Sequence, residues 1–240
     1  MSFKKCPGSQ KFNQPQPEII ACEFCRAEVE IWTDEAKATC PKCKKTIIRE
    51  GGASCLDWCK YAKECVGDSI YSKYMKNKVA TLKELLTKEM EAHFGEDGKR
   101  INHAKSVLSF AEELLTKEKA DWHIVVPASI LHDVGIKAAE AKYSSAAGHH
   151  QEKEGPAIAK KILLKFGFKK EDIEEICDII ARHHTPGKIT SMNFKVLYDA
   201  DWLVNIKDEV GIKDKDKSRR AIDAVFLTRA GKDMAKDLYL

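Results

Sequence analysis

The sequence predicts a mainly α protein, an all-helical bundle preceded by a small four-cysteine module with short β-hairpins. Apolar residues recur with helical spacing from about residue 78 onward. Eight of the nine cysteines lie between residues 6 and 65, and all eight histidines lie between residues 93 and 184. Because the two kinds of metal ligand occupy separate regions, we expect a Cys-rich module over residues 1–66 and a helical domain over 78–240.

Composition argues against several classes of partner. The chain has 240 residues, 43% of them hydrophobic, and a formal net charge of only +4, which offers no bulk attraction for nucleic acid or a membrane surface. Its longest apolar run, over residues 124–131, is far shorter than the ~20 residues of a membrane helix. Two lysines near the N-terminus precede no apolar stretch, so we expect no secretory signal and a cytoplasmic protein.

The N-terminal region contains a four-cysteine motif. Two Cys-x-x-Cys pairs are separated by fourteen residues: Cys22 and Cys25, then Cys40 and Cys43. A two-residue gap lets two sulfurs occupy adjacent corners of a tetrahedron, and the second pair supplies the other corners. Val29 and Ile31 alternate with glutamates between the pairs, which is typical of a strand. The pattern predicts a structural Zn²⁺ site of the zinc-ribbon or rubredoxin type.

Four further cysteines provide a second tetrahedral set: Cys6, Cys55, Cys59 and Cys65. Cys55 and Cys59 share a face if this segment is helical, and Cys65 could return to them from just beyond. Cys6 requires a long chain closure. We consider three interpretations, which are a second Zn²⁺ site, an iron–sulfur cluster, and cysteines that are simply buried.

The rest of the chain reads as consecutive helices. Apolar periodicity predicts helices over residues 79–94, 101–115, 121–135, 158–166, 173–184 and 194–206, with one or two more over 221–240. Asp121 is placed to cap one helix, and Gly135 and Gly167 to end two others. Histidines and aspartates fall near several of these helix ends, which predicts a ligand site within the bundle.

The order of these side chains carries a family resemblance. His103 comes first, the dipeptide His132-Asp133 follows in the string ILHDVG, and Asp201 comes last in LYDADWL. Two histidine pairs, at 149–150 and 183–184, lie between. Over roughly residues 95–230 this pattern resembles the HD-domain metal-dependent phosphohydrolases.

The resemblance implies specific ligands. One divalent metal, from among Mn, Fe, Co, Ni and Mg, would be bound by His103, His132, Asp133 and Asp201. A second metal would use two of the intervening histidines. We expect these to be His150 and His184, with His183 either joining or supporting them.

The resemblance also implies the reaction. A divalent ion polarises phosphate oxygens and activates water, and imidazole and carboxylate ligands leave positions open for both. We expect hydrolysis of a nucleotide or another small phosphate ester. Asp133 would take part in catalysis by bridging two metals, and Lys137 and Arg182 are the cations nearest in sequence that could bind substrate phosphates.

Two alternative functions stay open on the sequence. One is an adaptor that binds protein or nucleic acid through the Cys-rich module and carries a vestigial HD site. In this module four basic residues face an opposing set of acidic ones, so the electrostatic support for nucleic acid is weak. The other is a hydrolase gated by an iron–sulfur cluster at the second cysteine set.

Overall fold

The computed structural model describes residues 14–35, 37–48, 56, 59, 61–210 and 215–240. Two compact units divide the chain, Met1–Glu84 and Leu85–Leu240. The expected fold class is confirmed, since the N-terminal unit carries two small antiparallel sheets and the remainder is helical. Helix α3 (Asp68–Phe94) continues from one unit into the other. The domain limits 1–66 and 78–240 stay a prediction.

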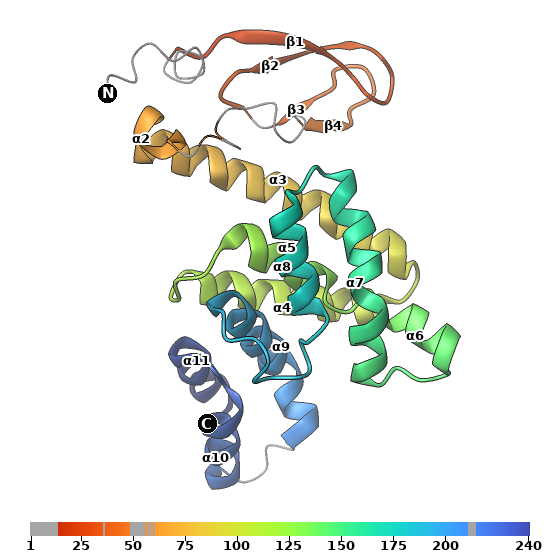
Figure 1. Cartoon of the computed structure of the whole chain (residues 1–240), viewed down its shortest axis with the longest axis vertical. Helices are drawn as coiled ribbons and strands as arrows, with labels where there is room; N and C mark the ends of the chain where they lie inside the picture. The colour runs from red at the N-terminus through yellow and green to blue at the C-terminus, as the bar shows by residue number, and fades with distance from the viewer. Residues whose placement is uncertain (1–13, 36, 49–55, 57–58, 60, 211–214) are drawn as a thin grey trace. The chain divides into compact units, whose positions relative to one another are not determined.

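Two hairpins form the β-structure of the N-terminal unit (Figure 1). Strand β1 (Pro17–Ala21) pairs with β2 (Glu28–Trp32), and β3 (Lys37–Thr39) pairs with β4 (Thr46–Ile48). The predicted alternation in β2 is confirmed, because Val29 and Ile31 are buried while the intervening glutamates are exposed. Val29 and Ile47 pack with Cys22 and Cys40, so the small core surrounds the cysteines.

A separate apolar cluster lies in the second half of this unit. It consists of Leu56, Ala62, Val66 and Tyr74, with Cys59 packed against it. The short helix α2 (Ala62–Val66) contains Cys65, whereas Cys59 precedes the helix. The arrangement expected for Cys55, Cys59 and Cys65 stays a prediction, because most of the segment from residue 55 to 60 lies outside the described residues. Cys6 and Cys55 lie outside the described residues.

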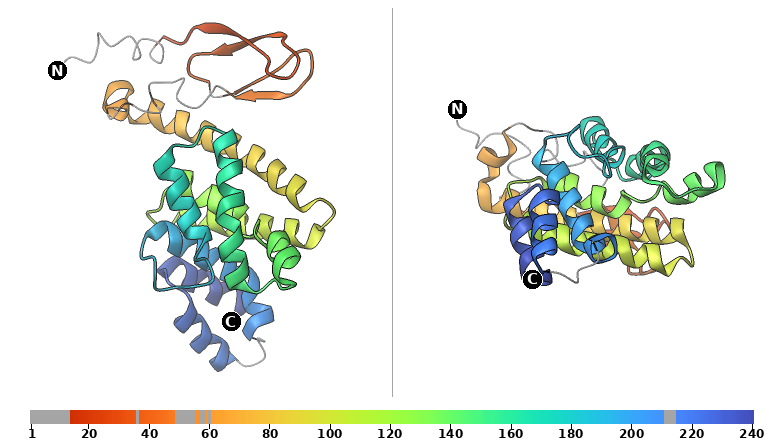
Figure 2. Two further views of the ribbon diagram at one scale, coloured as in Figure 1. Left: turned by 45° about the vertical axis from the view of Figure 1, so that its right-hand side comes forward. Right: turned by 90° about the horizontal axis from the view of Figure 1, so that it is seen from below.

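Consecutive helices build the C-terminal unit (Figures 1 and 2). They are α4 (Gly98–Leu115), α5 (Trp122–Leu131), α6 (Ile136–Tyr143), α7 (Gly148–Lys165), α8 (Lys170–Ile180), α9 (Met192–Val210), α10 (Lys215–Val225) and α11 (Arg229–Tyr239).

Helix α4 packs against α5 and α9. Helix α5 also contacts α8 and α9, while α7 packs on α6 and α8. All ten residues from Trp122 to Leu131 except the first two are buried, so α5 is a core helix with no polar face. Asp97 and Asp121 cap α4 and α5 by accepting hydrogen bonds from backbone N–H groups of their first turns.

Several helix boundaries differ from the sequence expectation, and the first expected helix begins at Asp68 instead of near residue 79. The helix expected to end at Gly135 ends at Leu131, and α6 follows after one turn. Helix α8 likewise ends at Ile180, which leaves the histidine pair in a turn.

A further difference is at α7, which begins at Gly148 instead of near residue 158. An added Cβ at Gly135 would lie 2.7 Å from the Gly155 nitrogen, so two glycines let the backbones of the α6 start and α7 meet closely. This packing outweighs the local tendency of Gly155-Pro156 to interrupt a helix.

Among the described helices, none is both long enough and apolar enough to traverse a lipid bilayer.

Candidate metal centres

The first candidate centre, the four-cysteine cluster, consists of Cys22, Cys25, Cys40 and Cys43, whose sulfurs all lie within 4.8 Å of one another. The sulfurs of Cys22 and Cys43 are 3.6 Å apart, as are those of Cys25 and Cys40. A tetrahedral ion with bonds of about 2.3 Å to sulfur needs sulfur–sulfur separations of about 3.8 Å. The geometry therefore fits a four-coordinate thiolate site.

Matching backbone turns hold the two halves of the four-cysteine cluster. The N–H of Arg26 donates to the Cys22 carbonyl, and the N–H of Lys44 donates to the Cys40 carbonyl. Both residues have positive φ, 59° and 60°, which closes each turn tightly just after its second cysteine. The N–H of Cys43 also donates to the Cys40 sulfur, which lowers the pKa of that thiol to about 6 and favours the thiolate.

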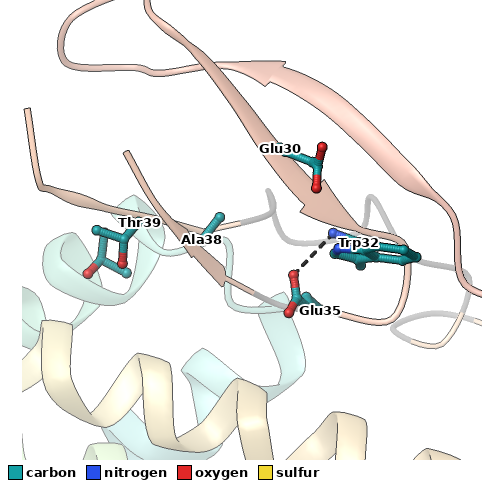
Figure 3. Close-up of a pocket in the computed structure, with 6 residues that line it drawn as sticks. Glu30, Trp32, Glu35, Ala38 and Thr39 are labelled. Atoms are coloured by element: carbon teal, nitrogen blue, oxygen red, sulfur yellow. Dashed lines mark hydrogen bonds between the residues drawn. The ribbon is translucent and has the colours of Figure 1, made fainter. Parts of the chain in front are cut away.

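A cavity of about 440 Å³ lies on the strands of this unit (Figure 3). Glu30, Trp32 and Glu35 contribute to its lining. A Glu35 carboxylate oxygen accepts a hydrogen bond from the backbone N–H of Trp32. Carboxylates repel nucleic-acid phosphates, so this surface does not favour the nucleic-acid version of the adaptor hypothesis.

The second candidate centre lies in the C-terminal unit, and we call it the His/Asp cluster. Its residues come from α4, from the turn after α5, from the turn after α8 and from α9: His103, His132, Asp133, His183 and Asp201. Four of the five are buried, and His103 is partly exposed. Helix packing thus brings together residues that are up to 98 positions apart.

The donor atoms of His103, His132 and Asp133 form one metal-capable group, and Asp201 lies beside it. His103 Nε2 lies 3.1 Å from Asp201 Oδ1, 3.3 Å from His132 Nε2 and 3.6 Å from Asp133 Oδ2. His132 Nε2 lies 3.4 Å from the same Asp133 oxygen. Ligand atoms about 2.1 Å from a shared ion are separated by about 3.0–3.4 Å. The separations therefore suit a common divalent cation.

Hydrogen bonds fix the orientation of two of these imidazoles. His132 Nδ1 donates to the Ser129 carbonyl at 2.8 Å, and His183 Nδ1 donates to the Ile180 carbonyl at 2.7 Å. Each ring, when neutral, therefore carries its lone pair on Nε2, which faces the cluster. His183 Nε2 is buried and has no hydrogen-bond partner among the described residues. A buried nitrogen without a partner is costly, and a cation would satisfy it.

Charge within the cluster is strongly coupled. Burial disfavours the charged form of His132, but the Asp133 and Asp201 carboxylates dominate and raise the pKa of this imidazole to about 9. Burial also disfavours the charged form of Asp133, yet His132 and His183 hold the pKa of this carboxyl well below its usual range. The carboxylates are therefore ionised and available to a cation.

Asp133 also belongs to a second metal-capable group, with His183 and His184. His183 Nε2 lies 3.6 Å from Asp133 Oδ1, the carboxylate oxygen that does not face His103. The ring of His184 packs against Gly148, where an added Cβ would approach its Cδ2 to 2.8 Å. One carboxylate thus faces both groups, the geometry that bridging requires.

Gln151 faces this second group from α7. Its side-chain NH₂ donates to the Ala146 carbonyl at 2.6 Å, so its Oε1 is the atom 3.3 Å from His184 Nε2. His150, the neighbouring residue expected from the sequence, stacks on Tyr143 at 4.1 Å between ring centroids. His150 is in neither metal-capable group of the described residues.

A cleft of about 300 Å³ opens beside the His/Asp cluster. Ten residues line it: Asp97, Lys99, Arg100, His103, Asp133, Ile136, Gln151, His184, Asp201 and Asn205. Lys137 and Arg182 do not line it. The Lys137 ammonium donates to the His93 carbonyl at 3.0 Å, and Arg182 pairs with Asp178 at 3.1 Å.

Sequence reasoning missed several residues of this cleft. Lys99 precedes His103 by four positions, and Asn205 follows Asp201 by four, a spacing that places side chains on one helix face. Asn205 donates to Asp201 Oδ1 at 2.8 Å and orients this carboxylate. The four-residue spacing from an expected ligand was the available signal. Gln151 offered none, because its orientation depends on where α7 begins.

Known protein families and solved structures that resemble the chain agree with this arrangement. The family model of the HD domain matches residues 100–224. A solved structure similar to the chain is that of a "predicted HD superfamily hydrolase" from an uncultured Thermotogales bacterium, with 25% sequence identity and a TM-score of 0.50. The similarity covers 64% of this chain and 83% of the other. No curated protein matches the sequence.

Proposed function

We propose that the protein hydrolyses a small phosphate ester, with nucleotides among the candidate substrates. The chain belongs to the HD-domain family, which makes it a metal-dependent hydrolase at the level of the family. The observation that carries the proposal is the convergence of His103, His132, Asp133 and Asp201 beside an open cleft. The buried Nε2 of His183 has no hydrogen-bond partner among the described residues, and a bound cation would supply one.

In this proposal one divalent ion would be held by His103, His132 and Asp133 together with Asp201, whose Oδ1 lies 3.1 Å from His103 Nε2, and a second by Asp133, His183 and His184. Such ions polarise phosphoryl oxygens and lower the pKa of water. The protein's own contribution is orientation. The Ser129 and Ile180 carbonyls fix two imidazoles, and Asn205 fixes the Asp201 carboxylate.

The prediction that Lys137 and Arg182 bind substrate phosphates belongs to the same proposal. Both are exposed and engaged outside the cleft, so they would have to exchange their present partners for the substrate. For the four-cysteine cluster we propose a structural Zn²⁺, since four thiolates in two matching turns are typical of that role.

The alternative functions have less support. A vestigial HD site would not be expected to keep both histidine orientations and the converging donors. The iron-gated hydrolase depends on Cys6 and Cys55, which lie outside the described residues. Visible absorbance and iron in anaerobically prepared protein would support it, and their absence would end it.

The test is a metal-resolved activity screen. Protein freed of metal by a chelator is reloaded with Mn, Fe, Co, Ni or Mg and assayed against nucleotides and other phosphate monoesters. We expect release of phosphate that disappears on chelation and returns with one or more of these ions. Bound metal in the C-terminal unit without hydrolysis of any phosphate ester would contradict the proposed reaction.

A further inference from the structure

The cleft beside the His/Asp cluster is lined by two cations, which differ in how they are engaged. Arg100 lines the cleft, but its guanidinium pairs with Asp97 at 2.9 Å and with both carboxylate oxygens of Glu140 at 2.5 and 3.1 Å. Lys99 also lines the cleft and is exposed. Within the described parts of the chain, the Lys99 ammonium has neither an ion pair nor a hydrogen bond.

Lys99 lines the same cleft as three residues of the His/Asp cluster, His103, Asp133 and Asp201. Lys99 and His103 are four residues apart, so their side chains share one helix face, about 6 Å apart along the axis. The exposed Lys99 side chain is flexible and about 6 Å long, so its ammonium can reach an anion at the mouth of that cleft.

The charged side chains that line the cleft determine which of them can attract an anionic substrate. Three carboxylates line it, from Asp97, Asp133 and Asp201, against the two cations Lys99 and Arg100. A divalent ion at the cluster would reverse the sign and attract an anion. Because two carboxylates already offset Arg100, Lys99 is the cleft side chain with charge to offer an incoming phosphate.

We propose that Lys99 binds the phosphate group of the substrate and so determines the preference of the cleft for phosphate monoesters. Arg100 acts in this proposal as a positioning residue. Its ion pairs with Asp97 and Glu140 hold the first turn of α4, from which the Lys99 side chain extends. The inference rests on the proposed function, since it names the residue that would recognise the substrate of that site.

The experiment measures binding of inorganic phosphate to the full chain loaded with Mn²⁺, by calorimetry, so that no turnover is needed. Lys99→Ala is expected to weaken phosphate binding roughly tenfold, because it removes a charge-assisted hydrogen bond. Lys99→Arg is expected to restore most of the affinity. High salt should narrow the difference between Lys99→Ala and the wild type.

Lys105→Ala is the matched control. Lys105 lies on the same helix, but it pairs with Glu91 at 2.6 Å and is absent from the cleft lining. We expect it to bind phosphate as the wild type does, and Lys99→Ala to raise KM for any hydrolysed monoester while Lys105→Ala does not.

Each failure has its own signature. Equal phosphate affinity for the wild type and Lys99→Ala overturns the assignment of Lys99, as does a wild type that binds no phosphate at all. If Lys99→Ala weakens phosphate binding but no ester is hydrolysed, the assignment stands as an anion site and the proposed reaction fails.

Discussion

The four-cysteine cluster and the His/Asp cluster reach similar donor separations by opposite routes. The sulfurs of the four-cysteine cluster come from two short turns at most 21 positions apart, with little packed core around them. The donors of the His/Asp cluster are spread over 98 positions and are placed by the packing of α4, α5, α8 and α9. A metal is therefore expected to stabilise the fold in the first case, whereas the fold prepares the site in the second.

The largest effect is expected at the His/Asp cluster, which the packing of the helices prepares for metal binding. Asp133→Ala removes a carboxylate that faces both metal-capable groups, and we expect hydrolysis to fall on the order of a thousandfold with helical content unchanged. Turnover of a phosphate ester and circular dichroism would measure this. Asp237→Ala, an exposed change on α11, is the control. Retained turnover in the Asp133 variant would show that the cluster is not the catalytic centre.

The next largest effect is expected at the four-cysteine cluster, where a bound metal would stabilise the fold of the N-terminal unit. Cys40→Ser should release the metal of the four-cysteine cluster and make the N-terminal unit sensitive to proteolysis, because structural zinc contributes about 10–16 kcal/mol of apparent binding free energy to such modules. Hydrolysis should be retained, since the cleft is lined by residues of the other unit.

Cys177→Ser provides the comparison for Cys40→Ser. The Cys177 sulfur donates to the Pro156 carbonyl at 3.4 Å and belongs to neither cluster. A serine hydroxyl can keep that bond, so zinc content and protease resistance should not change. If Cys40→Ser instead abolished hydrolysis without loosening the module, the contrast between the two clusters would be lost.

A smaller effect tests how packing prepares the His/Asp cluster. In Gly135→Ala the new Cβ would overlap the Gln151 carbonyl oxygen, so α6 and α7 must separate, at a cost of about 1–3 kcal/mol in unfolding free energy. Denaturant unfolding would measure it. Gly98→Ala has no atom within 4 Å of its Cβ and should leave stability nearly unchanged. Equal stability of the two variants would contradict the close approach.

The smallest effect concerns the extent of the second metal-capable group. His150→Ala removes a ring that stacks on Tyr143, so we expect no change in the metal content of the C-terminal unit. His183→Ala, which removes a ring of that group, should lower it. Loss of metal in the His150 variant would instead support the ligand role expected from the sequence.

The sequence by itself determined the four-cysteine cluster, because a two-residue spacing confines two sulfurs to one turn whatever the rest of the chain does. It also determined the helical fold class through apolar periodicity, and the family through the order of histidines and aspartates. These are properties of short segments or of residue order, so neither depends on how the helices pack.

Only the tertiary structure decided which neighbouring side chains face the cleft. Successive residues on a helix differ by about 100° in direction, so the start of α7 at Gly148 puts Gln151 in the cleft and His150 against Tyr143. Asp199 is fully buried and accepts hydrogen bonds from Leu227 and Thr228, while Asp201 faces His103. Likewise, the bidentate pairing of Arg100 with Glu140 of α6 depends on contacts between helices, and only its pair with Asp97 is local in sequence.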